Sequence, residues 1–409
     1  MHHNLRPISD ISIYIHVPFC PKKCRYCDFF SLAKQTSTTK RQIIGETLHQ
    51  LVYFLIELGN PRVATVYIGG GTPNELELPL ARYFFEAVYQ MLRSYAKSDD
   101  IKEWTVELNP ELITAEYLSL MAEYGVTRLS VGAQTFSERQ YDIIGRVGGT
   151  KQNRVALDCI RREWKRDLNI DIITALPDQR LSEAKLDIDS ATHYQPDHIS
   201  LYTLTIEDNT PLRDDARLGK IQPLDQQLAE SIWLRQMEKL ETMGYERYEV
   251  SNFAQQGKQC LHNLAYWKMS PYLGCGPASV STLPSTTGPH RLTTNRSFET
   301  FLTGRTSFWG ILDEAISARS FLIEHVMMGI RLSKGIDIRR LKRIFGIDLL
   351  KIVPRVFDEW FRKELLCVET DRVWLSQNGL NLLDRFLQEF IEELGETIPE
   401  RLVWPVLSR

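Results

Sequence analysis

The sequence has no long hydrophobic run, no excess of either charge and no apolar segment near its N-terminus. No stretch of about 18 apolar residues occurs, so we expect no membrane span. Lys and Arg number 49 against 52 Asp and Glu, a net charge of -3, whereas a bulk electrostatic nucleic-acid binder is clearly basic. The N-terminal MHHNLRPISD lacks the apolar core of a secretory signal, so no export is expected.

Cysteines are also few for the length of the chain, seven in 409 residues. An odd number in so large a chain is a poor basis for a disulfide framework. Three of them, Cys20, Cys24 and Cys27, lie within eight residues, and the other four are scattered. This distribution favours a reducing, cytoplasmic location and a metal or cluster site at residues 20–27.

Short β-branched and aromatic runs alternate with helical patterns over the first half of the chain. Runs in this rhythm predict parallel strands joined by helical crossovers, and their apolar character on both faces predicts a sheet covered on both sides. An incomplete α/β barrel and a flat doubly wound sheet both fit this pattern. The predicted strands are 12–17, 65–68, 104–108, 128–131, 170–173 and 198–204, and the predicted helices are 39–58, 79–95, 114–124, 150–164 and 182–194.

The pattern changes after about residue 210. A long amphipathic helix is predicted over 225–243, and the Gly, Pro, Ser, Thr and Asn content of 251–297 predicts a loop-dominated segment. Helices are then predicted at 314–328, 338–345, 353–363 and 380–394, with a hairpin at 365–375. Helices with a small hairpin resemble a winged-helix module. We therefore predict three parts, 1–210 (barrel), 211–310 (barrel extension) and 311–409 (winged-helix-like, mainly helical).

The clustered cysteines directly follow the first predicted strand, where active sites of parallel α/β folds collect. Structural zinc sites usually take four protein ligands, commonly from two cysteine pairs, and this sequence has no second closely spaced pair to complete such a set. Three thiolates on a four-iron cluster would leave one iron open to an outside ligand. Two alternatives are a surface loop with three reduced thiols and a zinc site completed by His16 or His262.

The spacing CxxxCxxC resembles the signature of the radical SAM superfamily. The wider string YIHVPFCPKKCRYCDFF, residues 14–30, resembles the oxygen-independent coproporphyrinogen III oxidase-like family, and within it the haem chaperone group. This resemblance implies a partial (β/α)6 TIM-like barrel and a [4Fe-4S] cluster held by Cys20, Cys24 and Cys27. It also implies S-adenosylmethionine (SAM) bound to the fourth iron, its reductive cleavage giving a 5′-deoxyadenosyl radical, and cofactor contacts from Tyr14 and Tyr26.

Two further motifs end predicted strands. Gly70, Gly71 and Thr72 belong to IGGGTP, in which glycines admit a ligand close to the backbone, although such a run can also form only a tight turn. Glu107, in ELNP, can bind an amine or a hydroxyl, or can simply cap the next helix. The resemblance implies that these residues contact SAM.

Gln134, Arg146 and Asp171 complete the implied SAM contacts. They lie in SVGAQTF, in IGR and at the fifth strand, although Arg146 can equally form a surface ion pair. Two strings depart from the family pattern. GRVGG places Gly148 where the family usually has His, and ALPDQR, residues 175–180, stands where the family usually reads GLPGQT. Both departures fall in segments that are expected to lie at the edge of the cofactor site.

A late motif, residues 262–267 (HNLAYW), resembles the haem-associated HNxxYW motif of the chaperone group. His262 can supply an axial haem ligand, while Tyr266 and Trp267 can pack on a porphyrin face. A single His in a polar loop is otherwise more often structural.

Three functions compete. The first is a haem chaperone that binds haem or porphyrin and passes haem to an acceptor protein. It is favoured by HNxxYW and by Phe29, which stands where the family's oxidase has a further cysteine. The second is the oxidase itself, or another radical SAM enzyme. The third is a nucleic-acid module built on the basic residues of 339–343, which more commonly form a solvated helix face, so we expect no nucleic-acid binding. The resemblance also implies a reducing partner such as flavodoxin or ferredoxin.

Overall fold

The computed structural model describes residues 5–96 and 101–405, and it is built around a twelve-stranded sheet. Six strands run parallel, and each lies beside the preceding one of the set in chain order. A doubly wound sheet reverses its strand order at a switch point, and within these six strands the order does not reverse, so the barrel alternative is confirmed. The six strands are β1 (Asp10–Val17), β4 (Arg62–Gly70), β5 (Glu103–Leu108), β6 (Arg128–Gln134), β7 (Asp167–Thr174) and β8 (His198–Thr203).

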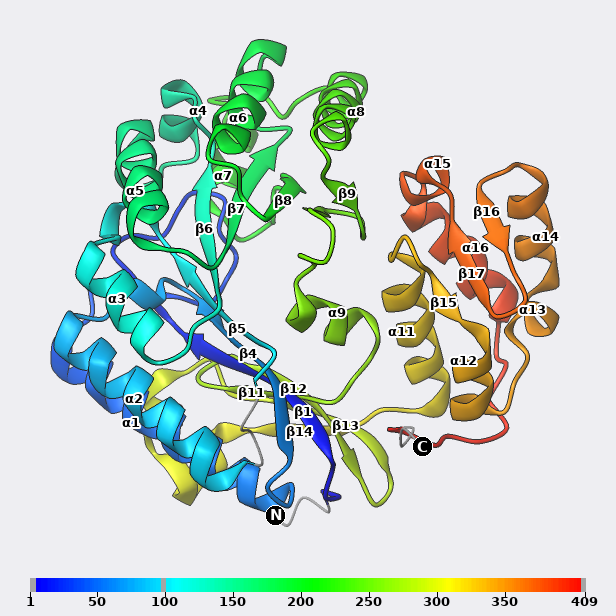
Figure 1. The fold of residues 1–409 in the computed structure, drawn as a ribbon. Helices are drawn as coiled ribbons and strands as arrows, with labels where there is room; N and C mark the ends of the chain where they lie inside the picture. The colour runs from blue at the N-terminus through cyan, green and yellow to red at the C-terminus, as the bar shows by residue number, and fades with distance from the viewer. Residues whose placement is uncertain (1–4, 97–100, 406–409) are drawn as a thin grey trace.

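Helices cover the outside of the parallel strands (Figure 1). Their buried side chains recur at helical spacing, as Leu80, Phe84, Val88 and Leu92 do in α2, because one face packs on the sheet. The helices are α1 (Ser37–Glu57), α2 (Leu78–Tyr95), α3 (Ala115–Glu123), α4 (Glu138–Ile143), α5 (Thr150–Glu163), α6 (Leu181–His193), α7 (Pro211–Arg217) and α8 (Gln226–Thr242). Six of them agree with the predicted helices to within two residues at either end, whereas the short helices α4 and α7 were not predicted.

The segment predicted as loop-dominated, 251–297, is instead largely regular, and that prediction was wrong. β11 pairs in parallel with β1, so strands from this segment extend the sheet beyond β1, while β10 pairs with β8 at the other side. The added elements are β9 (Glu246–Arg247), β10 (Asn252–Ala254), α9 (Leu261–Trp267), β11 (Tyr272–Cys275), β12 (Val280–Ser285), β13 (Gly288–Thr293), α10 (Phe298–Leu302) and β14 (Leu312–Ala315).

Small polar residues form these strands because tertiary contacts compensate for their low strand propensity. A Cβ on Gly274 would lie 2.2 Å from the carbonyl oxygen of Val280, so only glycine lets β11 approach β12 this closely. The buried Ser281 hydroxyl accepts a hydrogen bond from the Gly274 amide at 2.9 Å. Composition alone therefore suggested a loop where the chain pairs closely.

The C-terminal region packs around its own hydrophobic core and carries a three-stranded antiparallel sheet. Its first helix begins at Ala318, four residues later than predicted, because Ser317 caps it and residues 312–315 form β14. The helix predicted at 380–394 begins only at Leu383, and residues 377–380 form a separate short helix. The elements are α11 (Ala318–Ile330), β15 (Ile336–Asp337), α12 (Ile338–Phe345), α13 (Leu349–Ile352), α14 (Pro354–Arg362), β16 (Leu366–Val368), β17 (Arg372–Leu375), α15 (Gln377–Leu380) and α16 (Leu383–Leu394).

In Figure 1, α9 lies between the barrel strands and α11, and the two helices are in contact. The domain boundaries at 210 and 310 stay predictions. Within the described part of the chain, no helix has the length and apolar character needed to cross a bilayer.

Candidate functional site

The cysteine loop lies at the carboxyl end of β1, as the sequence predicted. Short strands β2 (Phe19–Cys20) and β3 (Leu32–Ala33) pair with each other and hold the two ends of the loop together. The backbone of Arg25 bonds to Ile144 and Leu212, both at 2.9 Å, and its side chain pairs with Asp215 in α7. The loop is thus attached to the barrel at several points rather than free in solvent.

Cys20, Cys24 and Cys27 are partly buried, form no disulfide and line one cavity of about 1130 Å³. Burial raises the pKa of all three thiols, that of Cys27 to about 11. Nearby positive charges act in the opposite direction, with Arg146 favouring the thiolates of Cys20 and Cys24. The thiols are protonated near neutral pH, and a bound metal would displace those protons.

A single-ion zinc site does not fit this arrangement. Nowhere in 5–96 or 101–405 do three His, Cys, Asp or Glu side chains form a group that could hold one metal ion. Both ring nitrogens of His16 are already hydrogen-bonded, Nδ1 to the Tyr14 hydroxyl and Nε2 to the Phe30 carbonyl, each at 2.9 Å. Three free thiols around a shared cavity fit a multi-iron cluster better, because its thiolates ligate different irons.

The glycine run at the end of β4 packs against the cysteine loop. A Cβ on Gly71 would lie 2.6 Å from the carbonyl oxygen of Phe19, and a Cβ on Gly70 would lie 2.2 Å from Nδ1 of His16. Thr72 Oγ1 lies 3.4 Å from Cys20 Sγ. All three motif residues line the cavity, so the glycines bring the backbone close both to the loop and to the space beside it.

We expect Gly71→Ala to lower the free energy of unfolding by about 1–3 kcal/mol, the usual cost of overpacking. The added methyl group meets backbone atoms of Pro18 and Phe19, which cannot rotate away as a flexible side chain does. Gly45→Ala in α1 is the matched control, since nothing lies within 4 Å of its Cβ position. Urea titration checks both variants, and equal stability of the Gly71 variant and wild type would contradict the packing described here.

Glu107 lies near the end of β5, is partly buried and lines the cavity. Its carboxylate accepts hydrogen bonds from the Tyr67 hydroxyl at 2.8 Å and from the Gly70 amide at 3.0 Å. Burial raises its pKa from 4.5 to about 7, with a smaller contribution from the negative charge of Asp171. A carboxyl group that ionises near neutral pH on a cavity wall is typical of a functional site.

This raised pKa predicts a pH dependence of stability. Between pH 4.5 and about 7 the folded protein holds a proton on Glu107 that the unfolded chain has released. The free energy of unfolding therefore falls as the pH rises through this window, by about 3 kcal/mol for this group. Glu107→Gln is expected to remove that part of the slope in urea titrations from pH 4.5 to 8. An identical slope in both proteins would show that Glu107 does not titrate there.

The other residues expected to contact SAM line the same cavity. Arg146 is held in place by a 2.9 Å hydrogen bond from Nη2 to Asn109 Oδ1. Asp171 accepts from Ser130 and Asn169 at 2.9 and 2.8 Å. Gln134 has a φ of +66°, which departs from the β6 conformation at its last residue. The lining residues expected from the sequence are Tyr14, Tyr26, Gly70, Gly71, Thr72, Glu107, Gln134, Arg146, Asp171, Tyr266 and Trp267.

His262 differs from its neighbours in the late motif. Tyr266 and Trp267 line the cavity, whereas His262 does not and is 0% exposed. Its Nδ1 bonds to Thr65 Oγ1 at 2.8 Å and its Nε2 to the Tyr266 hydroxyl at 2.9 Å. Burial lowers its pKa to about 3, so the ring is neutral. In this arrangement neither nitrogen is available to iron, and His262 instead holds Tyr266 against the barrel.

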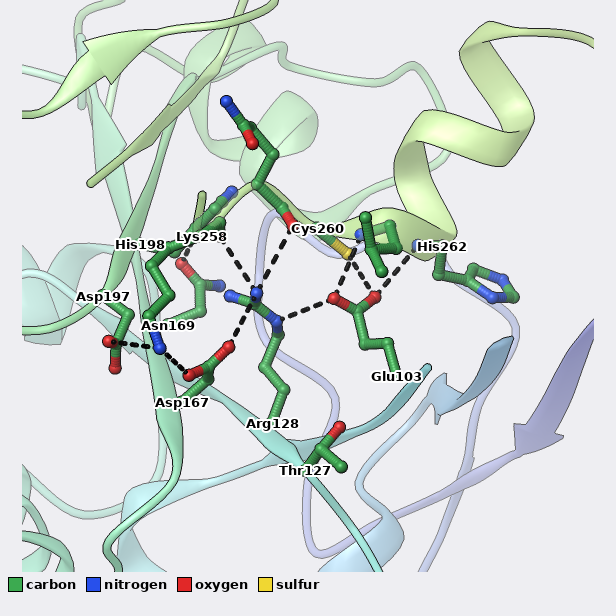
Figure 2. A network of polar contacts seen from close by, with 12 residues as sticks. Glu103, Thr127, Arg128, Asp167, Asn169, Asp197, His198, Lys258, Cys260 and His262 are labelled. Carbon is green, nitrogen blue, oxygen red and sulfur yellow. Dashed lines mark hydrogen bonds and ion pairs between the residues drawn. The ribbon is translucent and has the colours of Figure 1, made fainter. Parts of the chain in front are cut away.

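A buried charge network holds the start of α9, and it was missed from the sequence (Figure 2). The Glu103 carboxylate accepts hydrogen bonds from the His262 amide at 2.9 Å and the Leu261 amide at 3.0 Å, and Cys260 Sγ lies 3.3 Å from it. Arg128 pairs with Glu103 at 3.1 Å and donates to the Lys258 carbonyl at 2.9 Å. The network thus joins α9 to the amino ends of β5 and β6.

Comparison with known proteins identifies the family. The radical SAM superfamily model matches residues 14–190, and the HemN C-terminal domain model matches residues 316–382. The haem chaperone HemW of Escherichia coli (strain K12) is 34% identical over 286 residues, covering 68% of this chain and 72% of that protein. The chain belongs to the HemW family. HemW of Bacillus subtilis is 28% identical over 387 residues, 94% of this chain and all of that protein.

The fold of this HemW-family chain also matches a solved structure. The coproporphyrinogen III oxidase HemN of Escherichia coli, described there as a radical SAM enzyme, aligns with a TM-score of 0.79. It covers 95% of this chain and 91% of that one at 17% sequence identity, which supports a shared fold.

The departures from the family pattern can be located in this HemW-family structure. Ala175 and Asp178 replace glycines of the usual string, and both have positive φ, +56° and +54°. Glycine adopts this left-handed conformation without strain, whereas alanine and aspartate adopt it only at an energetic cost. Neither residue lines the cavity, and neither does Gly148. The substitutions therefore lie behind the cavity wall rather than on it.

Proposed function

We propose that this HemW-family protein binds a [4Fe-4S] cluster, SAM and haem, and passes haem to an acceptor protein. The observation that carries this proposal is a single cavity shared by the three thiols of the cysteine loop and the aromatic pair Tyr266 and Trp267. Its volume, about 1130 Å³, exceeds the upper range of sites for one small ligand, so it can hold two.

In this proposal Cys20, Cys24 and Cys27 hold the cluster, which supplies an electron to the sulfonium of SAM when both are bound. The residues proposed to hold SAM are Tyr14, Tyr26, Gly70, Gly71, Thr72, Glu107, Gln134, Arg146 and Asp171. An acidic reductant of the flavodoxin or ferredoxin type would supply electrons, since Lys22 and Lys23 add positive charge beside the thiols. A cytoplasmic location stays a prediction.

Charged side chains in the cavity wall favour the binding of a charged ligand. Glu107 lies close to its ionisation point, so a ligand ammonium beside it would favour the carboxylate and release a proton. The buried guanidinium of Arg146, fixed by Asn109, offers a permanent positive charge for a carboxylate. Gly70 and Gly71 leave room for a ligand at the backbone of β4.

Phe29 favours the proposed chaperone function over the oxidase function. The side chain is 70% exposed and lines the cavity two residues after Cys27. Phenylalanine provides neither a thiolate nor a proton donor at this position, which is the position of the oxidase's further cysteine. Decarboxylation of coproporphyrinogen III is therefore the less favoured function.

The test compares both reactions in reconstituted full-length protein under anaerobic conditions. Haem is titrated in, the protein is separated from free haem, and an apo b-type haem protein is added as acceptor. We expect a shifted Soret band on binding and its transfer to the acceptor. A parallel assay with coproporphyrinogen III, SAM and reductant is expected to release no CO₂ above a control without protein. Repeated turnover to CO₂ would overturn the chaperone proposal in favour of the oxidase.

A further inference from the structure

Between α9 and α11 the cavity has a wall that the proposed cluster and SAM contacts do not use. On the barrel side, Tyr266 and Tyr272 stack edge to face with ring centroids 4.6 Å apart. Trp267 is fixed by the Arg331 guanidinium, 4.1 Å from its ring centroid. Trp404 closes the wall and donates to the Met269 carbonyl at 2.9 Å. Flat aromatic side chains held rigidly suit a flat, largely apolar ligand.

The opposite side of this part of the cavity is α11, which contributes Glu324, Met327 and Met328. Positions three and four apart share one face of a helix, so both methionines lie on the face of Glu324. Met327 is 36% exposed, whereas Met328 packs partly into the core of the C-terminal region. Among the described lining residues His16 is the only imidazole, and its nitrogens are engaged. The thioether of Met327 is therefore an accessible soft donor for a metal here.

Two arginines, Arg291 and Arg296, line the same cavity as the methionines. Arg291 reaches Glu324 at 2.5 Å and the Tyr272 hydroxyl at 3.4 Å. Arg296 also lines the cavity and forms no hydrogen bond or ion pair with the described residues. In the same wall, Trp267 Nε1 and Thr282 Oγ1 are buried without a partner in 5–96 or 101–405. A ligand with carboxylate groups would satisfy such donors.

We propose that an iron tetrapyrrole lies between α9 and α11, with Met327 Sδ as an axial ligand of the iron and with Arg296 and Arg291 binding its carboxylates. This inference rests on the proposed haem-binding function and gives the site and the iron ligand. One neutral thioether holds iron less firmly than a thiolate does, which suits a protein that must release its haem. His262 keeps its structural role behind Tyr266.

The test titrates three ligands into the reconstituted full-length protein: haem, iron-free protoporphyrin IX and the dimethyl ester of haem. Met327→Leu removes only the sulfur, so its dissociation constant for haem is expected to rise roughly tenfold. Its affinity for protoporphyrin IX should stay unchanged. Met243→Leu is the control, because Met243 is exposed and lies outside the cavity, and this variant should bind like wild type. Arg296→Ala should weaken binding of haem and protoporphyrin IX alike, without affecting the dimethyl ester.

Magnetic circular dichroism of the haem complexes provides a second readout. The wild-type spectrum is expected to have the signature of methionine ligation, which Met327→Leu loses and Met243→Leu keeps. If the wild type binds haem and Met327→Leu leaves spectrum and affinity unchanged, the ligand assignment is wrong while the chaperone function stands. If the wild type binds no haem, both proposals fail.

Discussion

Replacing Arg128 with Met is expected to lower the free energy of unfolding by about 3–5 kcal/mol, because it leaves the Glu103 carboxylate buried without its cation. Arg128 and Glu103 are 3% and 5% exposed, so water cannot take the place of the missing partner. The substitution also removes the hydrogen bonds from Arg128 to the carbonyls of Lys258 and Gln259. Urea titration of the full chain measures the loss.

The control for this prediction is Arg82→Met. Arg82 forms a similar pair with Glu123 at 3.0 Å, but the two side chains are 49% and 52% exposed, so water screens the pair and the expected loss is much smaller than that of Arg128→Met. Hydrogen exchange over 258–267 distinguishes a local effect from a global one, since only Arg128→Met should speed exchange there at native conditions. Equal stability of the two variants would contradict the anchoring of α9 described above.

The second large effect is expected from the cysteine loop. Cys24→Ser is expected to reduce the iron content after anaerobic reconstitution from about four per chain to near zero, because two thiolates leave the cluster open at two corners. Cys159→Ser and Cys367→Ser are matched controls, since both thiols are half-buried and lie outside the cavity. Iron and sulfide analysis with circular dichroism of the fold checks all three variants. Full iron content in Cys24→Ser would exclude this residue as a ligand.

The parallel strands and their helices could be predicted because their sequences carry the signal locally. Runs rich in β-branched residues, such as 170–173, indicate a strand locally, and β7 includes that run. β12 carries no such signal, because Ser281 and Thr282 become buried only when Gly274 lets β11 approach. Segments whose partners are distant along the chain are therefore the ones that composition describes poorly.

The same distinction applies to the site. The spacing of the three cysteines is local, and it predicted a loop that the structure places at the carboxyl end of β1. The setting of His262 depends on Thr65, almost 200 residues away, and no local pattern indicates it. The sequence indicates the Glu103–Arg128 pair only weakly. Charged residues begin three consecutive buried strands, at Glu103, Arg128 and Asp167. Unpaired charge is too costly there, so a network could have been anticipated.

The proposed site requires three thiolates that hold a cluster with one iron open to a small molecule. EPR spectroscopy of the reduced, reconstituted wild-type protein, recorded with and without SAM, measures this open position. We expect a [4Fe-4S] signal whose g values change when SAM is added. An EPR signal that does not change at a saturating concentration of SAM would contradict this proposal. A chain that holds a single zinc ion and no sulfide would also contradict it.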